Sequence, residues 1–101
     1  MNKVEFKGNL GKNAKLFYTK KGKAGIHLSV AINEEEREAT WVTVFAHSST
    51  AKKAFNLNLV LGDFVHIKGE LRSNGKGELH VVPYFIERLA LKSIDNDDIP
   101  F

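Results

Sequence analysis

The chain has 101 residues, 43% hydrophobic and 27% charged, which is enough for one globular domain with a single core. It has no cysteine, no apolar run of about 18 residues and no leader sequence, which excludes disulfides and membrane spans and makes the reducing cytoplasm the expected location. The net charge is +3 although three aspartates lie in the last seven residues, so the body is basic and predicts a polyanionic partner; a basic domain without such a partner is the alternative.

The first predicted strand lies within Asn2–Gly11 and has a glycine in its apolar row. Val4, Phe6 and Gly8 alternate with charged residues, which is the period of a half-buried strand. A glycine in such a row marks a bulge, a bend or the close approach of another backbone. A first strand that bends can pair with two different strands, and we expect a short β-barrel to close in this way.

Further strands and one helix follow. A brief strand fits Lys15–Lys20, and full strands are predicted at Gly25–Asn33, Thr40–Ala46, Phe64–Arg72 and within Glu78–Leu91. A short helix is predicted from about Thr50 to Asn58, because Ala51, Ala54 and Phe55 recur at helical spacing. Five strands with one short helix between the third and the fourth predict an all-β fold, the five-stranded OB-fold barrel.

The strand at Thr40–Ala46 carries the only tryptophan. Trp41, Thr43 and Phe45 share one face, and Val42 and Val44 share the other. The sequence leaves open which face is inside. Trp41 is therefore either a base-stacking residue or a core or interface residue.

Other aromatic and basic residues suit a nucleic-acid partner. Phe17 and Tyr18 lie beside a basic turn, and we expect one to stack on bases while the other packs inward. His47 either presents its ring to a base or is solvated. The cations predicted to contact phosphates, with solvated loops as the alternative, are Lys7, Lys12, Lys15, Lys20, Lys21, Lys23, Lys53 and Arg72.

The sequence has no recognisable catalytic or metal-binding arrangement. The four histidines lack the spacing of a zinc site, and no phosphate-binding glycine motif or nucleophile elbow occurs. Glu34–Glu38 is a charge run typical of a solvated turn. We therefore predict a protein that is not an enzyme and that needs no cofactor or metal.

The acidic end differs in kind from the rest of the chain. Ile99 and Phe101 follow the aspartates directly in DNDDIPF, and a partner pocket with an apolar hole and a basic rim would hold both features. A frayed end is the alternative. We predict a domain over residues 1–92 and a partner-binding tip over residues 93–101.

Several motifs occur in the order found in one family. The chain resembles the bacterial-type single-stranded DNA-binding proteins over nearly its full length. The matching pieces are NKV at Asn2–Val4, GNLG at Gly8–Gly11, SVA at Ser29–Ala31, Trp41–Phe45 and VHIKGELR at Val65–Arg72. The ending DDIPF at Asp97–Phe101 is the most specific of them.

This resemblance implies an OB-fold that binds single-stranded DNA without strong sequence preference and protects it during replication, recombination and repair. It implies a homotetramer, less often a dimer. It places Trp41 at a base-stacking tryptophan of the family and His47 at a stacking aromatic residue. It also implies a tip that recruits partner proteins through Asp95, Asp97, Asp98, Ile99, Pro100 and Phe101.

The chain departs from the family pattern in three places, which predicts a smaller DNA footprint. Glu34–Glu38 stands where the family often has another tryptophan, the hairpin near Ser73–Gly77 is short, and the linker before the tip is nearly absent. The alternative function is a primosome-type OB protein-interaction module with weak nucleic-acid binding, against which the tip argues. An RNA-binding module of cold-shock type is a further alternative.

Overall fold

The computed structural model describes residues 1–91; the predicted tip, Asp95–Phe101, lies outside the described residues. The elements in chain order are β1 (Val4–Leu10), β2 (Lys15–Tyr18), β3 (Ala24–Ile32), β4 (Thr40–His47), α1 (Ser48–Leu57), β5 (Phe64–Ser73) and β6 (Leu79–Ala90). Within residues 1–91, no helix is both long enough and apolar enough to cross a membrane.

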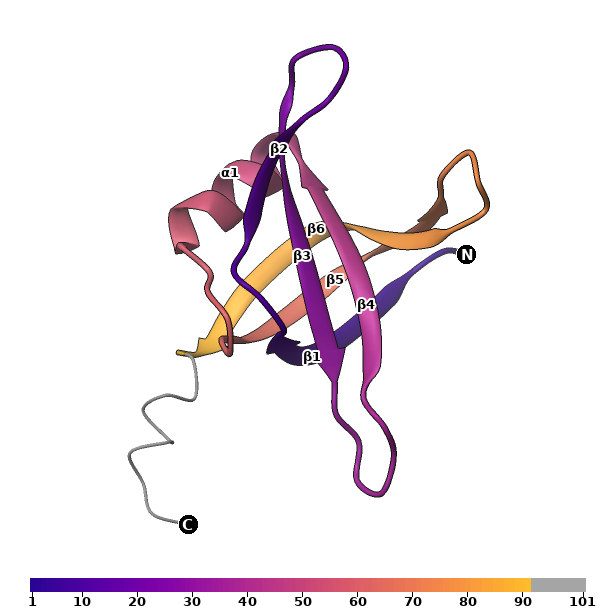
Figure 1. Cartoon of the computed structure of the whole chain (residues 1–101), viewed down its shortest axis with the longest axis vertical. Helices are drawn as coiled ribbons and strands as arrows, with labels where there is room; N and C mark the ends of the chain where they lie inside the picture. The colour runs from indigo at the N-terminus through magenta and orange to yellow at the C-terminus, as the bar shows by residue number, and fades with distance from the viewer. Residues whose placement is uncertain (92–101) are drawn as a thin grey trace.

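Five strands form a closed barrel, which confirms the predicted OB-fold (Figure 1). The strand order is β1-β5-β6-β4-β3, β3 returns to β1, and the short strand β2 is added at the far edge of β3. All neighbouring pairs are antiparallel except β4 and β6, which run parallel at Val44 and Val81. The helix lies between β4 and β5, because β2 counts as a separate strand, and it begins two residues earlier than predicted.

The barrel closes where β1 changes partner. This strand pairs with β5 from Val4 to Asn9 and with β3 at Asn9 and Leu10. A Cβ atom built on Gly8 would lie 2.4 Å from the carbonyl oxygen of Ala31, so only a glycine fits between the two backbones. Of the three roles predicted for this glycine, a bulge, a bend or the close approach of another backbone, the structure shows the close approach.

The core is built from the inward residues of the alternating strands. The large side chains with no exposed surface are Leu28, Val30, Val44, Val65, Ile67 and Ile86. Burial of each such side chain contributes roughly 1.5–3 kcal/mol. Ala51 and Ala54 of α1 join the same core, and their small side chains let the helix lie close to the barrel.

A buried carboxylate organises the connection between α1 and β5. Asp63 is almost fully buried, and its Oδ2 accepts a hydrogen bond from the Val60 N–H at 3.0 Å. Arg88 of β6 lies 3.6 Å from the same oxygen and donates a hydrogen bond to the Leu57 carbonyl at 2.6 Å. These contacts hold the last turn of α1 beside the end of β6.

We predict that Gly8→Ala lowers the free energy of unfolding by about 1–3 kcal/mol, because the added methyl group overlaps the Ala31 backbone. Urea denaturation followed by circular dichroism measures the change. Gly75→Ala is the control, since a Cβ atom there meets nothing within 4 Å. Equal stability of the two variants would contradict the proposed closure.

Candidate nucleic-acid interface

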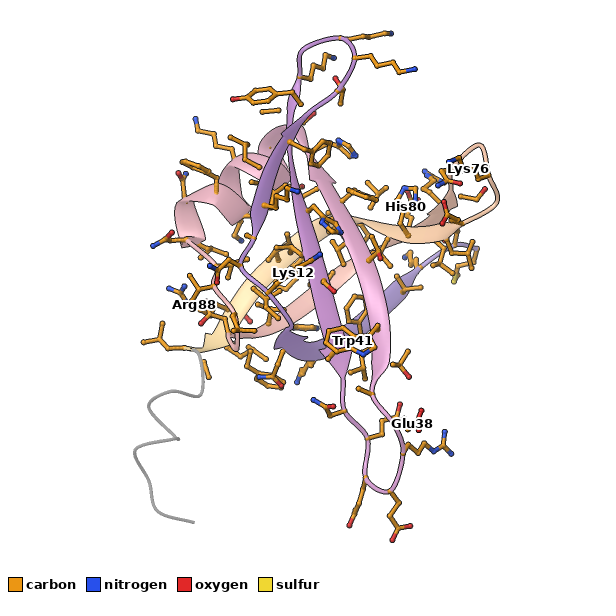
Figure 2. The ribbon with its side chains drawn as sticks, in the orientation of Figure 1. Lys12, Glu38, Trp41, Lys76, His80 and Arg88 are labelled. Atoms are coloured by element: carbon orange, nitrogen blue, oxygen red, sulfur yellow. The ribbon has the colours of Figure 1, made fainter. Side chains whose placement is uncertain are left out.

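The outward face of β4 carries the tryptophan. Val44 and Ala46 are buried in the core, whereas Trp41 is 61% exposed and His47 is exposed at the end of the strand. The structure thus shows which face of β4 is inside and removes the core alternative for Trp41. Trp41 lies on the surface of the isolated chain, and Figure 2 shows it near the lower end of β4.

Phe45 is the centre of an aromatic cluster on the same face. The His27 ring of β3 stacks on it at 4.9 Å between centroids with an angle of 25°. Phe17 of β2 and His80 of β6 make T-shaped contacts with it, at 5.6 and 5.2 Å between centroids. His47 contacts Phe17 at 5.9 Å, so the cluster draws rings from four strands.

Two glycines let aromatic rings lie close to the backbone. A Cβ atom on Gly11 would come within 2.2 Å of the Trp41 ring, and one on Gly25 within 2.3 Å of the Phe17 ring. The rings therefore occupy the space that side chains at these glycines would fill. The Trp41 ring lies against Gly11, directly after β1, and the Phe17 ring lies against Gly25 of the neighbouring strand β3. These contacts orient the faces of both rings before any ligand binds.

Two of the predicted cations lie beside the cluster. Burial, followed by the positive charges of Lys12 and Lys15, lowers the pKa of His27 below its ordinary value. His27 is therefore neutral at neutral pH, and the two ammonium groups are close enough to act on it electrostatically. An anion bound here would meet these two charges next to half-buried aromatic rings.

Three more lysines occupy the turn between β2 and β3. Lys20, Lys21 and Lys23 are exposed, and the turn is closed by the hydrogen bond from the Thr19 N–H to the Lys23 carbonyl at 2.8 Å. Figure 1 shows this turn projecting from one end of the molecule. Tyr18, next to the turn, is 68% exposed, so it does not pack into the core.

The remaining predicted cations lie elsewhere. Lys53 of α1 sits over the Phe85 ring, with Nζ 5.4 Å from the centroid. Lys7 of β1 lies opposite His66 of β5 in the strand register. The His66 side chain forms a hydrogen bond with Glu5 at 2.6 Å. Arg72 forms an ion pair with Glu70 at 2.7 Å.

The β5–β6 hairpin forms one wall of a hollow next to the cluster. Its turn is closed by Asn74, whose Oδ1 accepts hydrogen bonds from the Lys76 and Glu78 N–H groups at 2.7 and 3.1 Å. The short hairpin near Ser73–Gly77 is thus present. The hollow has a volume of about 210 Å³ and is lined by Thr43, Phe45, Asn74, Glu78, Leu79 and His80.

Sequence reasoning did not select the centre of this site. The sequence places Phe45 on the Trp41 face without marking it as a binding residue, and it shows His27 and His80 only as histidines that lack the spacing of a zinc site. The outward parity of Phe45 and His27 on neighbouring strands is a signal that could have found them. His80 gave no such signal, because its contact with Phe45 depends on the pairing of β6 with β4.

The barrel defines an OB-fold protein. Its aromatic and basic surface is suited to a flexible polyanion that carries flat rings. The model of the Single-strand binding protein family matches residues 1–78, and the chain belongs to that family. No curated protein matches the chain.

Solved structures agree with this assignment. The single-stranded DNA binding protein of Thermus aquaticus, as a deletion mutant, is 31% identical with a TM-score of 0.74 over 87% of this chain. The chain spans only 40% of that protein's length. The second single-stranded DNA binding protein of Mycobacterium smegmatis (22% identity, TM-score 0.73, 87% of this chain and 88% of that one) shares the fold. The mitochondrial single-stranded DNA binding protein Rim1 of Saccharomyces cerevisiae also shares the fold. It is 14% identical with a TM-score of 0.78, over 89% of this chain and 95% of that one.

We predict that replacing Lys12 and Lys15 together with glutamine raises the pKa of His27 while leaving it below the ordinary value, because burial remains. An NMR titration of the His27 ring protons measures the shift. In the parent chain, the stability that His27 contributes as a neutral group is present above its ordinary pKa of about 6.5 and is lost as the pH falls below it.

Lys53→Gln is the control for this titration, since Lys53 lies over Phe85 and not beside His27. If the double variant and the control gave the same His27 pKa as the parent chain, the two lysines would not face the aromatic cluster.

Proposed function

We propose that the chain binds single-stranded DNA on the outward face of β2, β3 and β4, without strong sequence preference. The observation that carries this proposal is the line of outward rings along β4, in which Trp41, Phe45 and His47 lie on one face beside Phe17 and His27. Base stacking on such rings is worth about 1–3 kcal/mol per base and tolerates any sequence, because every base has a flat face.

The lysines supply the second half of the interaction. Lys12 and Lys15 lie beside His27, and the lysines of the β2–β3 turn extend the positive charge beyond the end of β4. Cations along a row of stacking rings fit a single strand, whose bases are unpaired and whose phosphates run alongside them. A duplex hides the base faces and would meet only the charges.

The family and the sequence of the tip support a proposal for the cellular role. We propose that the protein protects single-stranded DNA in replication, recombination and repair in the cytoplasm and acts by binding, not by catalysis. We further propose that Asp95–Phe101 recruits partner proteins. The support for this step is the sequence of the tip, with its aspartates next to Ile99 and Phe101.

We also propose that the chain forms a homo-oligomer, and we favour a tetramer over a dimer. β1 offers an edge for assembly, because in the described part of the chain its pairing with β3 covers only Asn9 and Leu10. The stretch from Val4 to Lys7 pairs with β5 alone. Two copies could pair through this edge in an antiparallel, isologous arrangement.

The single tryptophan makes the central test direct. Titration with a thymine oligonucleotide should quench Trp41 fluorescence strongly, and an equal amount of duplex should not. Trp41→Ala should weaken binding of the single strand, measured by anisotropy of a labelled oligonucleotide, by about 1–3 kcal/mol, or roughly 5- to 150-fold in Kd.

Phe55→Ala is the matched control, because Phe55 is 62% exposed but lies on α1. It should leave the affinity unchanged. Equal binding by the parent chain and Trp41→Ala would remove Trp41 from the interface. Absence of any binding by the parent chain would overturn the proposed function.

Salt dependence tests the role of the lysines. The logarithm of the binding constant falls linearly with the logarithm of the salt concentration. Removing one phosphate contact from a single-strand complex makes this slope less steep by about 0.7. We expect this loss for Lys12→Gln and again for Lys15→Gln. Lys53→Gln should keep the parent slope, and an equal loss in all three variants would indicate a general effect of net charge.

A further inference from the structure

The hollow between Phe45 and the β5–β6 hairpin combines apolar and polar surface. Its volume of about 210 Å³ is below the roughly 300–1,000 Å³ of pockets that hold drug-sized ligands, so it suits one small group. Phe45 and Leu79 supply the apolar surface, and Leu79 is 66% exposed. The other lining side chains are polar, namely Thr43, Asn74, Glu78 and His80. The hollow therefore offers contact for a flat ring and hydrogen-bonding partners for the edge of that ring.

The hollow opens on the row of outward side chains along β4. Thr43, which lines it, stands between Trp41 and Phe45 in this row, because alternate residues of a strand share a face. A single strand that stacks along these rings passes the opening. One of its bases can therefore turn its edge into the hollow.

Glu78 brings a negative charge to the hollow. Its Oε1 accepts a hydrogen bond from the Asn74 Nδ2 at 2.8 Å, and a carboxylate with about four acceptor sites can accept further bonds. None of the described residues that line the hollow is a lysine or an arginine. The ion pairs within residues 1–91 join other groups, His66 with Glu5, Arg72 with Glu70 and Arg88 with Asp63.

The two sides of the aromatic cluster carry opposite charges. On the β3 side, Lys12 and Lys15 act electrostatically on His27. On the β6 side, Glu78 lines the hollow together with His80. Figure 2 shows Lys12 and His80 on either side of β3 and β4. Phosphates are attracted by the lysines and repelled by the carboxylate, so a bound nucleotide lies with its phosphate toward β3 and its base edge toward the hollow.

A carboxylate at this place distinguishes bases by the donors on their edges. Cytosine, adenine and guanine carry an exocyclic amino group, and carboxylates accept hydrogen bonds from such a group, as from N4 of cytosine. Uracil and thymine carry a carbonyl oxygen where cytosine has its amino group. Two acceptors that face each other repel, and each remains without a donor. Because Glu78 is exposed and water can replace the lost bond, the resulting preference is modest.

We propose that the hollow holds the edge of one base of the bound strand and that Glu78 selects a base with an exocyclic amino group over uracil or thymine. This inference rests on the proposed function and adds a specificity-determining residue to the same site. The preference concerns one base position, since stacking on the other rings tolerates any sequence.

Binding of labelled oligodeoxycytidine and oligodeoxyuridine of equal length, measured by anisotropy at one salt concentration, tests this proposal. The two bases differ at the amino or carbonyl group and at the adjacent ring nitrogen, so their sizes are matched. We expect the parent chain to bind the cytidine strand about 2- to 10-fold more tightly, the effect of one net hydrogen bond. Equal affinities, or tighter binding of the uridine strand, would overturn the proposal.

Variants of Glu78 test which group makes the distinction. Glu78→Ala and Glu78→Gln should both bring the ratio of the two affinities close to one, because alanine has no acceptor and a glutamine amide can pair with either base. The turn is kept, since the Asn74 Oδ1 accepts from the backbone N–H groups of Lys76 and Glu78. A cytidine preference that survives in both variants would remove Glu78 from base selection.

Glu38→Gln is the matched control for charge. It removes one negative charge from the turn between β3 and β4, and Figure 2 shows Glu38 at the opposite end of β4 from His80. Loss of a carboxylate should strengthen the binding of both strands in the Glu38 and Glu78 variants alike. Only the Glu78 variants should change the ratio. An equal change of the ratio in Glu38→Gln would indicate net charge and would overturn the proposal.

NMR of the isotope-labelled parent chain locates the effect. The amide signals of Leu79 and His80 should shift further with the cytidine strand than with the uridine strand, whereas those of Lys20 and Lys21 should shift equally with both. A cytidine preference without this difference would place base selection outside the hollow. If neither strand bound, the proposed function would fail and this inference with it. If both bound equally, the proposed function would stand and base selection alone would fail.

Discussion

The close crossing of β1 and β3 at Gly8 is the constraint on which the rest of the structure depends. The glycine lets β1 leave β5 and continue on β3, and this exchange closes the sheet into a barrel. Closure in turn decides which side of every strand is inside. Once Val44 and Ala46 point to the core, Trp41, Phe45 and His47 must point outward together, because side chains alternate along a strand. The stacking surface is thus a consequence of barrel closure.

The outer surface of the barrel is divided by chemistry. Rings from four strands gather around Phe45, with Lys12 and Lys15 beside them, and this is the part of the described surface where stacking and cationic groups combine without a neighbouring ion pair. On the face of β1 and β5, by contrast, the hydrogen bond from His66 lowers the pKa of Glu5, and acidic and basic groups neutralise one another. A polyanion is attracted to the first surface more than to the second. Net charge alone does not reveal this difference.

The two faces of β2 have different surroundings. Phe17 joins the aromatic cluster, while Leu16 forms a wall of an apolar groove against α1, which is also lined by Ile26 and Phe55. A four-residue edge strand therefore separates the proposed DNA-binding face from the apolar groove. Such a strand can serve both because successive side chains point to opposite sides, so a ligand on one face leaves the other open.

The sequence by itself determined the strands of the OB-fold, the position of the helix within about two residues and Gly8 as a special position in the first strand. These features are local: they depend on alternation, on glycine and on residue type. Only the tertiary structure decided that Trp41 faces outward, that His27 and His80 meet Phe45, and that Lys53 lies over Phe85 instead of beside the cluster. Alternation shows that a strand has two faces but not which one is buried. That choice is made by barrel closure and by the pairing of strands far apart in the chain.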